Sequence, residues 1–419
     1  MLRRGVQLVL AIVLGVATSQ VWAEDWPQWR GPTGDHHAAP GATAPTTWSE
    51  TEGLAWATPV PGAGHSSPTL VGNRIYLTTS DEQAQTQSLL IFDRQTGELL
   101  AEKLVHRGGL ERGIHRNNTH ASQTVASDGE RVFAVFGNEA AAWVTAFDLD
   151  GNQLWQTRAT SYAPQQYSFG YGTSPVVVGD KVIVTSVFDG PGSSIKAFDT
   201  RTGQERWSAD RPQYLSYSPP ARLPLSSGTQ LLLSGNAQVT LYDADSGDQL
   251  WKTPAPWQAT CGTMVWDEAS GLGFASGGYP PNATLAVRLD GDHSVVWQNS
   301  VKCYESSLIT HEGYLYGVSD EVGVAYCWRC ADGQQMWKAR LSGACSASLV
   351  EVGGNLYIST ERGATHVFVA TPERYTPIAT NQLGDDTFAT MTPADGRLYH
   401  RFAKTVDGRR QEYLAAIGP

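Results

Sequence analysis

The stretch AFDTRTGQERW, residues 197–207, decides the fold because variants of it recur along the chain. An acid stands two residues after a small or aliphatic residue, a turn glycine follows, and a tryptophan comes four residues after the glycine. The copies are LYDADSGDQLW at 241–251, the shorter AFDLDGNQLW at 146–155, the weaker VRLDGDHSVVW at 287–297 and CWRCADGQQMW at 327–337, and IFDRQTGELLA at 91–101, which has alanine in place of tryptophan.

Each copy predicts a β-hairpin. The alternation of Ile195, Ala197 and Asp199 indicates a half-buried strand. The glycine supplies the positive φ that tight turns require. The next strand then opens with tryptophan, a side chain that can bury about 150–250 Å² against a neighbouring unit. Recurrence makes this hairpin the repeated unit of the fold.

A second phrase opens each unit with a small or polar start, an apolar strand, a turn and another strand. Its clearest copies are HSSPTLVGNRIYLTT from His65, YGTSPVVVGDKVIVTS from Tyr171 and YESSLITHEGYLYGVS from Tyr304, and the other openings lie near His120, Tyr217, Cys261, Cys345 and Thr387. Successive openings are 55, 51, 46, 44, 43, 41 and 42 residues apart. That period is typical of four short strands per propeller blade, and no sustained helical stripe competes with it.

The sequence therefore predicts an all-β, eight-bladed β-propeller of four-stranded antiparallel blades over residues 54–419, preceded by an extended segment at 24–53. Residues 387–419 have room for only three strands, the last at about 413–417. We expect the strand at 54–60, which carries Trp56, to join this last blade and close the ring, leaving no free sheet edge. Seven blades with one irregular repeat are the alternative.

Residues 1–23 predict a secretory signal peptide. Arg3 and Arg4 precede an apolar stretch at about 8–17, and Val-Trp-Ala at 21–23 suits a cleavage site near Ala23. The apolar stretch is shorter than the roughly 20 residues that span a bilayer, although an N-terminal membrane anchor is the alternative. We expect a periplasmic or secreted protein with no transmembrane segment, and no lipid anchor because no cysteine lies near the cleavage site.

Composition excludes several classes of protein. An apolar fraction of 41% over 419 residues excludes a disordered chain. Lys and Arg number 30 against 41 Asp and Glu, for a net charge of −11, and no basic run stands out. We therefore expect no nucleic-acid partner. We also expect a monomer.

The tryptophan phrases resemble the PQQ-like repeat family of eight-bladed propellers. Residues 197–207 match its tryptophan-docking pattern A-x-D-x-x-T-G-x-x-x-W throughout. The segments DWPQWRGP at 25–32 and GHSSP at 64–68 are similar to exported propellers of the PQQ-binding-like or BamB-like type. Fold and compartment follow from this resemblance more directly than activity does.

The resemblance implies two functions. The BamB-like branch implies an exported, non-catalytic scaffold that binds a protein, peptide or glycan partner through its loop face and channel mouth. The alternative is a quinoprotein dehydrogenase with a reduced funnel, which would bind PQQ and Ca²⁺. The chain lacks the adjacent cysteine pair of many such enzymes, no motif matches their calcium ligands, and the lipobox cysteine of BamB is absent as well.

Aromatic and imidazole side chains open several inner strands. Because the innermost strands of a propeller line its channel, we expect a ring of binding residues near the channel mouth. These are His65, His120, Tyr171, Tyr217 and Tyr304. Alternatively, these side chains plug the channel and bond to one another or to trapped water.

The connection at 106–119, HRGGLERGIHRNNT, is long for a compact fold and combines basic and amide side chains. Arg112, His115, Arg116 and Asn117 are candidate binding residues that could attract an anionic ligand. The alternative is a solvated surface loop. Metal binding by histidines 106, 115 and 120 fits no strong spacing signature, so no metal site is predicted.

The cysteines leave their pairing open. Cys327 and Cys330 form a C-x-x-C pair inside the repeated phrase, without the second pair that a zinc site needs. A disulfide or free buried thiols are both compatible with the set Cys261, Cys303, Cys327, Cys330 and Cys345. No nucleophile or metalloprotease signature occurs, so no catalytic residue is predicted.

Overall fold

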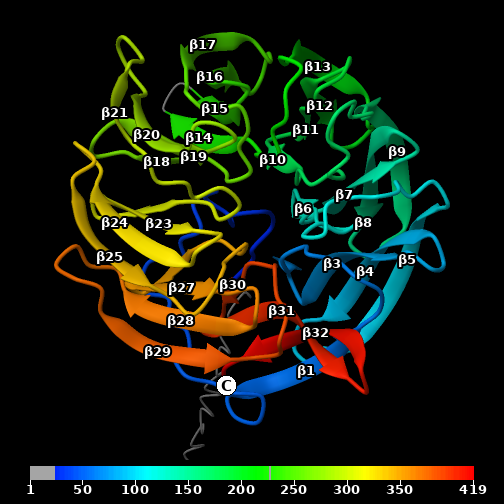
Figure 1. Ribbon diagram of the computed structural model, residues 1–419. Helices are drawn as coiled ribbons and strands as arrows, with labels where there is room; N and C mark the ends of the chain where they lie inside the picture. Colours follow the sequence, from blue (N-terminus) through cyan, green and yellow to red (C-terminus); the bar gives the residue numbers. More distant parts are fainter. Residues whose placement is uncertain (1–23, 226–227) are drawn as a thin grey trace, which may run out of the picture.

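The chain folds into a ring of eight blades, each an antiparallel sheet of four strands (Figure 1). The computed structural model describes residues 24–225 and 228–419, so the expected signal peptide lies outside the described residues. Every regular element in the described ranges is a strand, which confirms the predicted all-β propeller and its count of eight blades. None of the described residues form a helix long and apolar enough to cross a membrane.

Seven blades follow the chain, each running from the centre of the ring to its rim (Figure 1). Blade 1 comprises β2 (Thr69–Val71), β3 (Arg74–Asp81), β4 (Thr86–Asp93) and β5 (Leu99–Arg107). Blade 2 comprises β6 (Ala126–Ser127), β7 (Arg131–Asn138), β8 (Ala141–Asp148) and β9 (Gln153–Ser161). Blade 3 comprises β10 (Val176–Val178), β11 (Lys181–Ser186), β12 (Ser194–Asp199) and β13 (Glu205–Asp210). Blade 4 comprises β14 (Ala221–Leu225), β15 (Gly228–Gly235), β16 (Gln238–Asp243) and β17 (Gln249–Pro254).

The second half of the ring repeats the same order of strands. Blade 5 comprises β18 (Val265–Asp267), β19 (Leu272–Gly277), β20 (Ala283–Arg288) and β21 (Val295–Asn299). Blade 6 comprises β22 (Ile309–His311), β23 (Tyr314–Ser319), β24 (Val324–Arg329) and β25 (Gln335–Arg340). Blade 7 comprises β26 (Val350–Val352), β27 (Asn355–Ser359), β28 (Ala364–Val369) and β29 (Pro377–Gln382).

Blade 8 joins the two ends of the ring, as predicted. It consists of β30 (Thr392–Ala394), β31 (Arg397–Val406), β32 (Arg409–Ile417) and, on its outer edge, β1 (Leu54–Val60). β1 pairs antiparallel with β32, from Leu54 opposite Ile417 to Val60 opposite Glu412. The pairing covers the outer edge of β32, which would otherwise be free to pair with another chain.

The strand that carries the repeated phrase is buried on both faces, so the prediction of a half-buried strand is wrong. In β12, Ile195 and Phe198 are both nearly inaccessible, yet they belong to two separate apolar clusters. Each blade is covered by a neighbour on either side, and a strand in the middle of such a stack has no solvent face. Successive side chains along the strand therefore face the two neighbouring blades in turn, and not the core and the solvent in turn.

The tryptophans of the repeat connect consecutive blades. The Nε1 of Trp155 in blade 2 donates to the carbonyl oxygen of Thr200 in blade 3 at 3.1 Å, and its ring covers Gly203. Trp207 repeats the contact one blade on, donating to Ala244 at 3.1 Å. Where blade 1 lacks the tryptophan, the side chain of Lys103 covers the equivalent Gly151.

Gly203 is required both for its backbone conformation and for its lack of a side chain. It adopts φ +71°, and a Cβ there would lie 2.6 Å from the Trp155 ring. We expect Gly203→Ala to lower the free energy of unfolding by about 2–3 kcal/mol, since it adds overpacking to backbone strain. The control is Gly408→Ala, with φ +73° and no atom within 4 Å of a Cβ, which should cost about 1 kcal/mol. If urea denaturation shows that both variants lose the same free energy of unfolding, contact with the Trp155 ring does not add to the cost at Gly203.

The N-terminal segment crosses the channel at the far ends of the inner strands, and Figure 1 shows it in dark blue near the centre of the ring. It contacts every blade. Its partners are Leu70, Ser127, Val177, Arg222, Thr263, Leu308, Leu349 and Asp395, one from each blade or the loop leading into it. The segment around 25–32 thus closes one end of the channel.

Candidate functional site

A cavity of about 960 Å³ opens at the other end of the channel, where the chain enters the innermost strands. We call it the central cavity. Its lining is rich in aromatic and hydroxyl side chains. The aromatic and imidazole residues are Trp29, His65, His115, Tyr167, Phe169, Tyr214, Tyr217, Tyr279, Tyr304 and Phe388. A pocket of this size with an aromatic wall and a few polar groups is typical of a ligand site.

The floor of the cavity is formed by a ring of hydroxyl side chains, one in every blade except blade 4, which we call the hydroxyl belt. Its members are Ser67, Thr124, Ser174, Ser307, Ser348 and Thr390, which line the cavity, and Thr263, which contacts Trp29 and Ser307 without lining it; Pro219 takes the place of a hydroxyl in blade 4. The backbone amide of one member donates to the hydroxyl of the next, as Ser67 does to Thr124 and Ser348 does to Thr390. The belt therefore fixes the inner strands relative to one another.

Trp29 closes the centre of this floor. The residue belongs to the N-terminal segment, yet it lines the cavity, and its Nε1 donates to the Thr263 hydroxyl at 2.8 Å. Its indole lies edge-on to His36, with ring centroids 4.7 Å apart. The cavity is thus a funnel that Trp29 closes on the side of the N-terminal segment and that opens where the chain enters the innermost strands, which we call the loop face.

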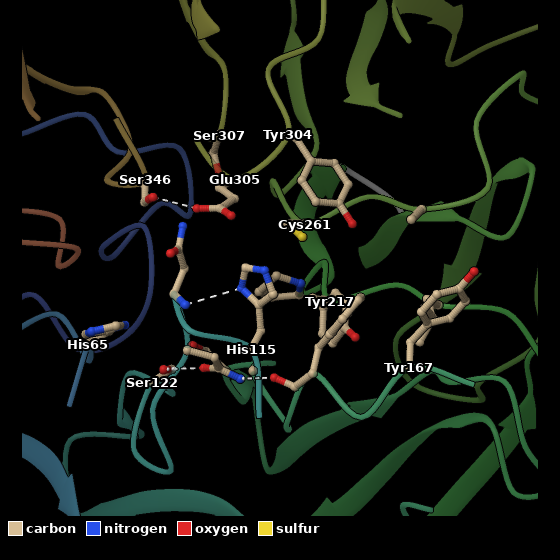
Figure 2. Close-up of a pocket in the computed structure, with 18 of the residues that line it drawn as sticks. His65, His115, Ser122, Tyr167, Tyr217, Cys261, Tyr304, Glu305, Ser307 and Ser346 are labelled. Atoms are coloured by element: carbon tan, nitrogen blue, oxygen red, sulfur yellow. Dashed lines mark hydrogen bonds between the residues drawn. The ribbon is translucent and has the colours of Figure 1, made fainter. Parts of the chain in front are cut away.

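The wall of blades 5 and 6 presents tyrosines. Tyr279 and Tyr304 pack edge to face with centroids 5.0 Å apart, and the ammonium of Lys302 lies 4.6 Å from the Tyr279 ring. Figure 2 shows Tyr304 with Cys261 and Glu305 on this wall, and His115 projecting from the loop between blades 1 and 2. Aromatic rings with polar tips can both pack and form hydrogen bonds with a bound chain.

Carboxylates give the same wall an acidic character. The Ser346 hydroxyl lies 2.5 Å from Glu305 and 2.8 Å from Glu361 (Figure 2 shows the bond to Glu305). Burial raises the pKa of Glu305. Burial likewise raises the pKa of Asp320 behind the wall to about 6.

The structure brings five of the nine candidate residues to the central cavity. They are His65, His115, Asn117, Tyr217 and Tyr304. The His65 ring stacks on Phe388 with centroids 4.4 Å apart. Its surroundings of protein atoms lower its pKa to about 3, so the ring is neutral at physiological pH.

The other four candidates lie elsewhere. Tyr171 is 4% exposed and packs on Tyr162, with its hydroxyl donating to Thr185. His120 lies 3.7 Å from Glu82, outside the cavity lining. Arg112 and Arg116 are exposed on the loop and do not line the cavity either.

The charge of the lining does not favour an anionic ligand. Its charged residues among those the structure describes are Asp189 and Glu305, and no Arg or Lys is present. The cavity therefore suits a neutral or basic group. The histidines of the loop do not gather at a shared metal site, since His106 packs on Phe136 and Trp143.

The quinone that the resemblance implies fits this lining poorly. PQQ is a polycarboxylate and needs cationic partners, which the described lining does not offer. Asp189 is already engaged by the backbone amides of Gln165 and Gln166 at 2.9 and 2.6 Å. We therefore derive no redox step through PQQ.

All five cysteines carry free thiols in the structure. Cys303, Cys327, Cys330 and Cys345 are buried, and Cys261 lines the cavity. Burial raises the pKa of Cys327 and Cys345 to about 12, so these groups are neutral thiols. Of the two readings left open by the sequence, the structure has free thiols and no disulfide.

Comparison with known proteins supports the resemblance to BamB-like propellers. The family model described as outer membrane protein assembly factor BamB matches residues 17–157 and 85–339. An outer membrane protein assembly factor BamB from Bordetella pertussis is 27% identical over 221 residues, which cover 51% of this chain and 46% of that protein. The match thus spans about half the length of this curated relative.

Solved structures share the fold at low sequence identity. BamB from Moraxella catarrhalis aligns with TM-score 0.59 and 14% identity over 86% of this chain and 99% of that one. Quinohemoprotein alcohol dehydrogenase from Comamonas testosteroni aligns with TM-score 0.61 and 12% identity over 94% and 81%. A computationally designed protein, Ika8, aligns with TM-score 0.57 and 14% identity over 85% and 98%. At such identities the likeness extends to the fold alone.

Proposed function

Because this chain belongs to the family described as outer membrane protein assembly factor BamB, we propose that it is an exported, non-catalytic scaffold that binds a segment of a partner protein in the central cavity. The observation that supports this most directly is the funnel itself. It is open toward the loop face, walled by tyrosines and closed below by Trp29. A rigid ring of this kind needs no rearrangement to receive an extended peptide.

The chemistry of the wall defines the segment that would fit. Tyrosines are over-represented among residues that dominate binding energy, because a large ring is fixed at small entropic cost. Tyr214 and Tyr217 offer such rings from the loop that leads into blade 4, and Tyr304 offers one from the loop that leads into blade 6. With Asp189 and Glu305 as the charged lining residues and a net charge of −11, the cavity favours a neutral or basic peptide over an acidic one.

Site-specific photocrosslinking in cells tests this proposal. A benzophenone amino acid at Tyr214, which lines the cavity and is 51% exposed, should form an adduct with the partner. The matched control is the same group at Leu250, 46% exposed on the outer strand β17, which should form none. Adducts at both positions or at neither would contradict binding in the cavity.

Purified components then identify the class of ligand. Tyr304→Ala should weaken binding of the crosslinked partner peptide by at least about tenfold, as expected for a residue that dominates an interface. If the purified protein binds an oligosaccharide and not the peptide, its partner is a glycan and not a protein. A rise in melting temperature with PQQ and Ca²⁺, together with dye-linked alcohol oxidation, would favour the quinoprotein dehydrogenase instead.

A further inference from the structure

Two histidines and one glutamate meet on the side of the hydroxyl belt that faces away from the central cavity. His37 comes from the N-terminal segment, His311 ends β22 in blade 6, and Glu351 lies in β26 of blade 7. One ligand atom of each lies within 4.8 Å of the others. We call these residues the His-His-Glu cluster. It joins three parts of the chain that are far apart in sequence.

The hydrogen bonds of His37 leave one ring nitrogen to be explained. Its Nε2 lies 2.7 Å from the carbonyl oxygen of Thr310, which can only accept, so Nε2 carries a hydrogen. Its Nδ1 lies 3.2 Å from a carboxylate oxygen of Glu351. In a neutral imidazole this Nδ1 would present a lone pair to an anion. The contact is favourable only with a positive charge between the two atoms, either a proton or a metal ion.

The other two residues are placed as ligands would be. The Glu351 side chain is 8% exposed, and its second oxygen accepts from the backbone amide of Gly354 at 2.6 Å, which fixes the carboxylate. The His311 ring lies parallel to that of His37, with centroids 6.0 Å apart and an interplanar angle of 13°. Among the described residues, the His311 side chain has no hydrogen-bond partner. A ligand histidine whose other N–H is bonded to a backbone carbonyl, like His37, is common in zinc sites.

We propose that the His-His-Glu cluster binds a divalent transition-metal ion of the zinc class. Two imidazoles and one carboxylate, with a fourth position left for water, are a ligand set that zinc accepts. Zinc bonds of about 2.0–2.2 Å require the three ligand atoms to approach more closely than the 4.8 Å limit, which the partly exposed rings of His37 and His311 allow. The ion would fasten the N-terminal segment to blades 6 and 7.

This site differs in role from the central cavity. Metal binding at the His-His-Glu cluster would hold the segment that closes the channel, and with it Trp29 at the cavity floor. The inference does not rest on the proposed partner, because it concerns residues on the opposite side of the hydroxyl belt. The competing explanation is a protonated His37 paired with Glu351 without any metal.

Zinc titration of the untagged protein separates the two explanations. After treatment with EDTA and removal of the chelator, isothermal titration with zinc chloride should show one site per chain. Zinc should also raise the melting temperature by about 2 °C or more, since it binds only the folded chain. His311→Gln and Glu351→Gln should each weaken zinc binding by at least about tenfold, the lower limit seen even for residues that only support a ligand.

Glu312→Gln is the matched control, since this acid adjoins His311 but is not part of the cluster, and its zinc affinity should be unchanged. Cobalt(II) offers an independent readout, because a bound ion gives visible absorption that His311→Gln should abolish. Absence of a 1:1 zinc complex, or equal zinc affinity in the wild type and both cluster variants, would overturn the proposal and leave a proton between His37 and Glu351.

Discussion

Replacing Arg401 with methionine should lower the free energy of unfolding by about 3–5 kcal/mol, because it leaves the buried Glu412 carboxylate with only the partly exposed Arg410 as an ionic partner. The side chains of Arg401 and Glu412 are both 2% exposed. The Nε of Arg401 donates to Glu412 at 2.6 Å, and its Nη1 donates to the Ser66 hydroxyl at 2.9 Å and to the Thr78 carbonyl oxygen at 2.7 Å. Guanidinium denaturation measures the loss.

The position of this pair explains the size of the expected effect. Arg401 and Glu412 lie in blade 8, whereas Ser66 and Thr78 belong to blade 1, so the pair fastens the seam where the ring closes. Gly64 has no room for a side chain, since a Cβ there would lie 2.7 Å from the Arg401 guanidinium. The seam thereby also positions the next residue, His65, at the cavity.

Two further variants test the argument. Lys196→Met removes one partner of a partly exposed pair with Glu205 and should cost less than about 1 kcal/mol. Combining Arg401→Met with Glu412→Leu should restore part of the stability, because no charge is then left buried. If Arg401→Met costs no more than Lys196→Met, the seam does not depend on this ion pair.

The fold was predictable because the repeat encodes contacts between neighbours. A tryptophan four residues after a turn glycine recurs along the chain, and several copies pack on the glycine of the next blade, as Trp207 does on Gly247. Trp251 instead stacks on His293 of the next blade. Because each of these contacts joins only adjacent blades, the repeat is enough to predict the ring without contacts between residues far apart in the sequence. Even the closure followed from counting, since the last blade lacked one strand and residues 54–60 supplied it.

The lining of the cavity was only partly predictable because the sequence phrases that start the blades were aligned on their large residues and not on the Ser or Thr of the hydroxyl belt. In every blade, the residue two positions before the belt member lines the cavity, since side chains of an extended chain alternate with a period of two. These residues are His65, Ser122, Gly172, Tyr217, Cys261, Glu305, Ser346 and Phe388. Tyr171 lies three positions before Ser174 and is therefore directed into the core. The recurring Ser or Thr was the signal that would have corrected the register.

The closure of the channel had no comparable signal. Residues 24–53 are irregular, with no period that a sequence argument could use, and their partners are distributed over all eight blades. Trp29 and the His-His-Glu cluster depend on that path. Only the folded ring brings His37 next to His311 and Glu351.

Acidification should destabilise the protein strongly between about pH 6.5 and pH 4 because neutral histidines are buried in it. The His400 ring is inaccessible, and neither of its nitrogens has a hydrogen-bond partner among the described residues. Burial lowers the pKa of His400 to about 3. Because the unfolded chain takes up a proton near pH 6.5 that the folded chain excludes, this contribution to stability is complete above pH 6.5 and is lost as the pH falls toward 3.

His400→Met isolates that contribution. From pH 7 to pH 5 the wild type should lose about 2 kcal/mol more stability than the variant, which has no group to titrate at this position. The control is Phe402→Leu on the same strand, whose ring stacks with His400 at a centroid distance of 6.1 Å. It should lower stability by a similar amount at both pH values, because it alters packing without removing a titratable group. Urea denaturation at the two pH values measures the difference. If His400→Met keeps the wild-type pH dependence, the buried imidazole is not what makes the propeller sensitive to acid.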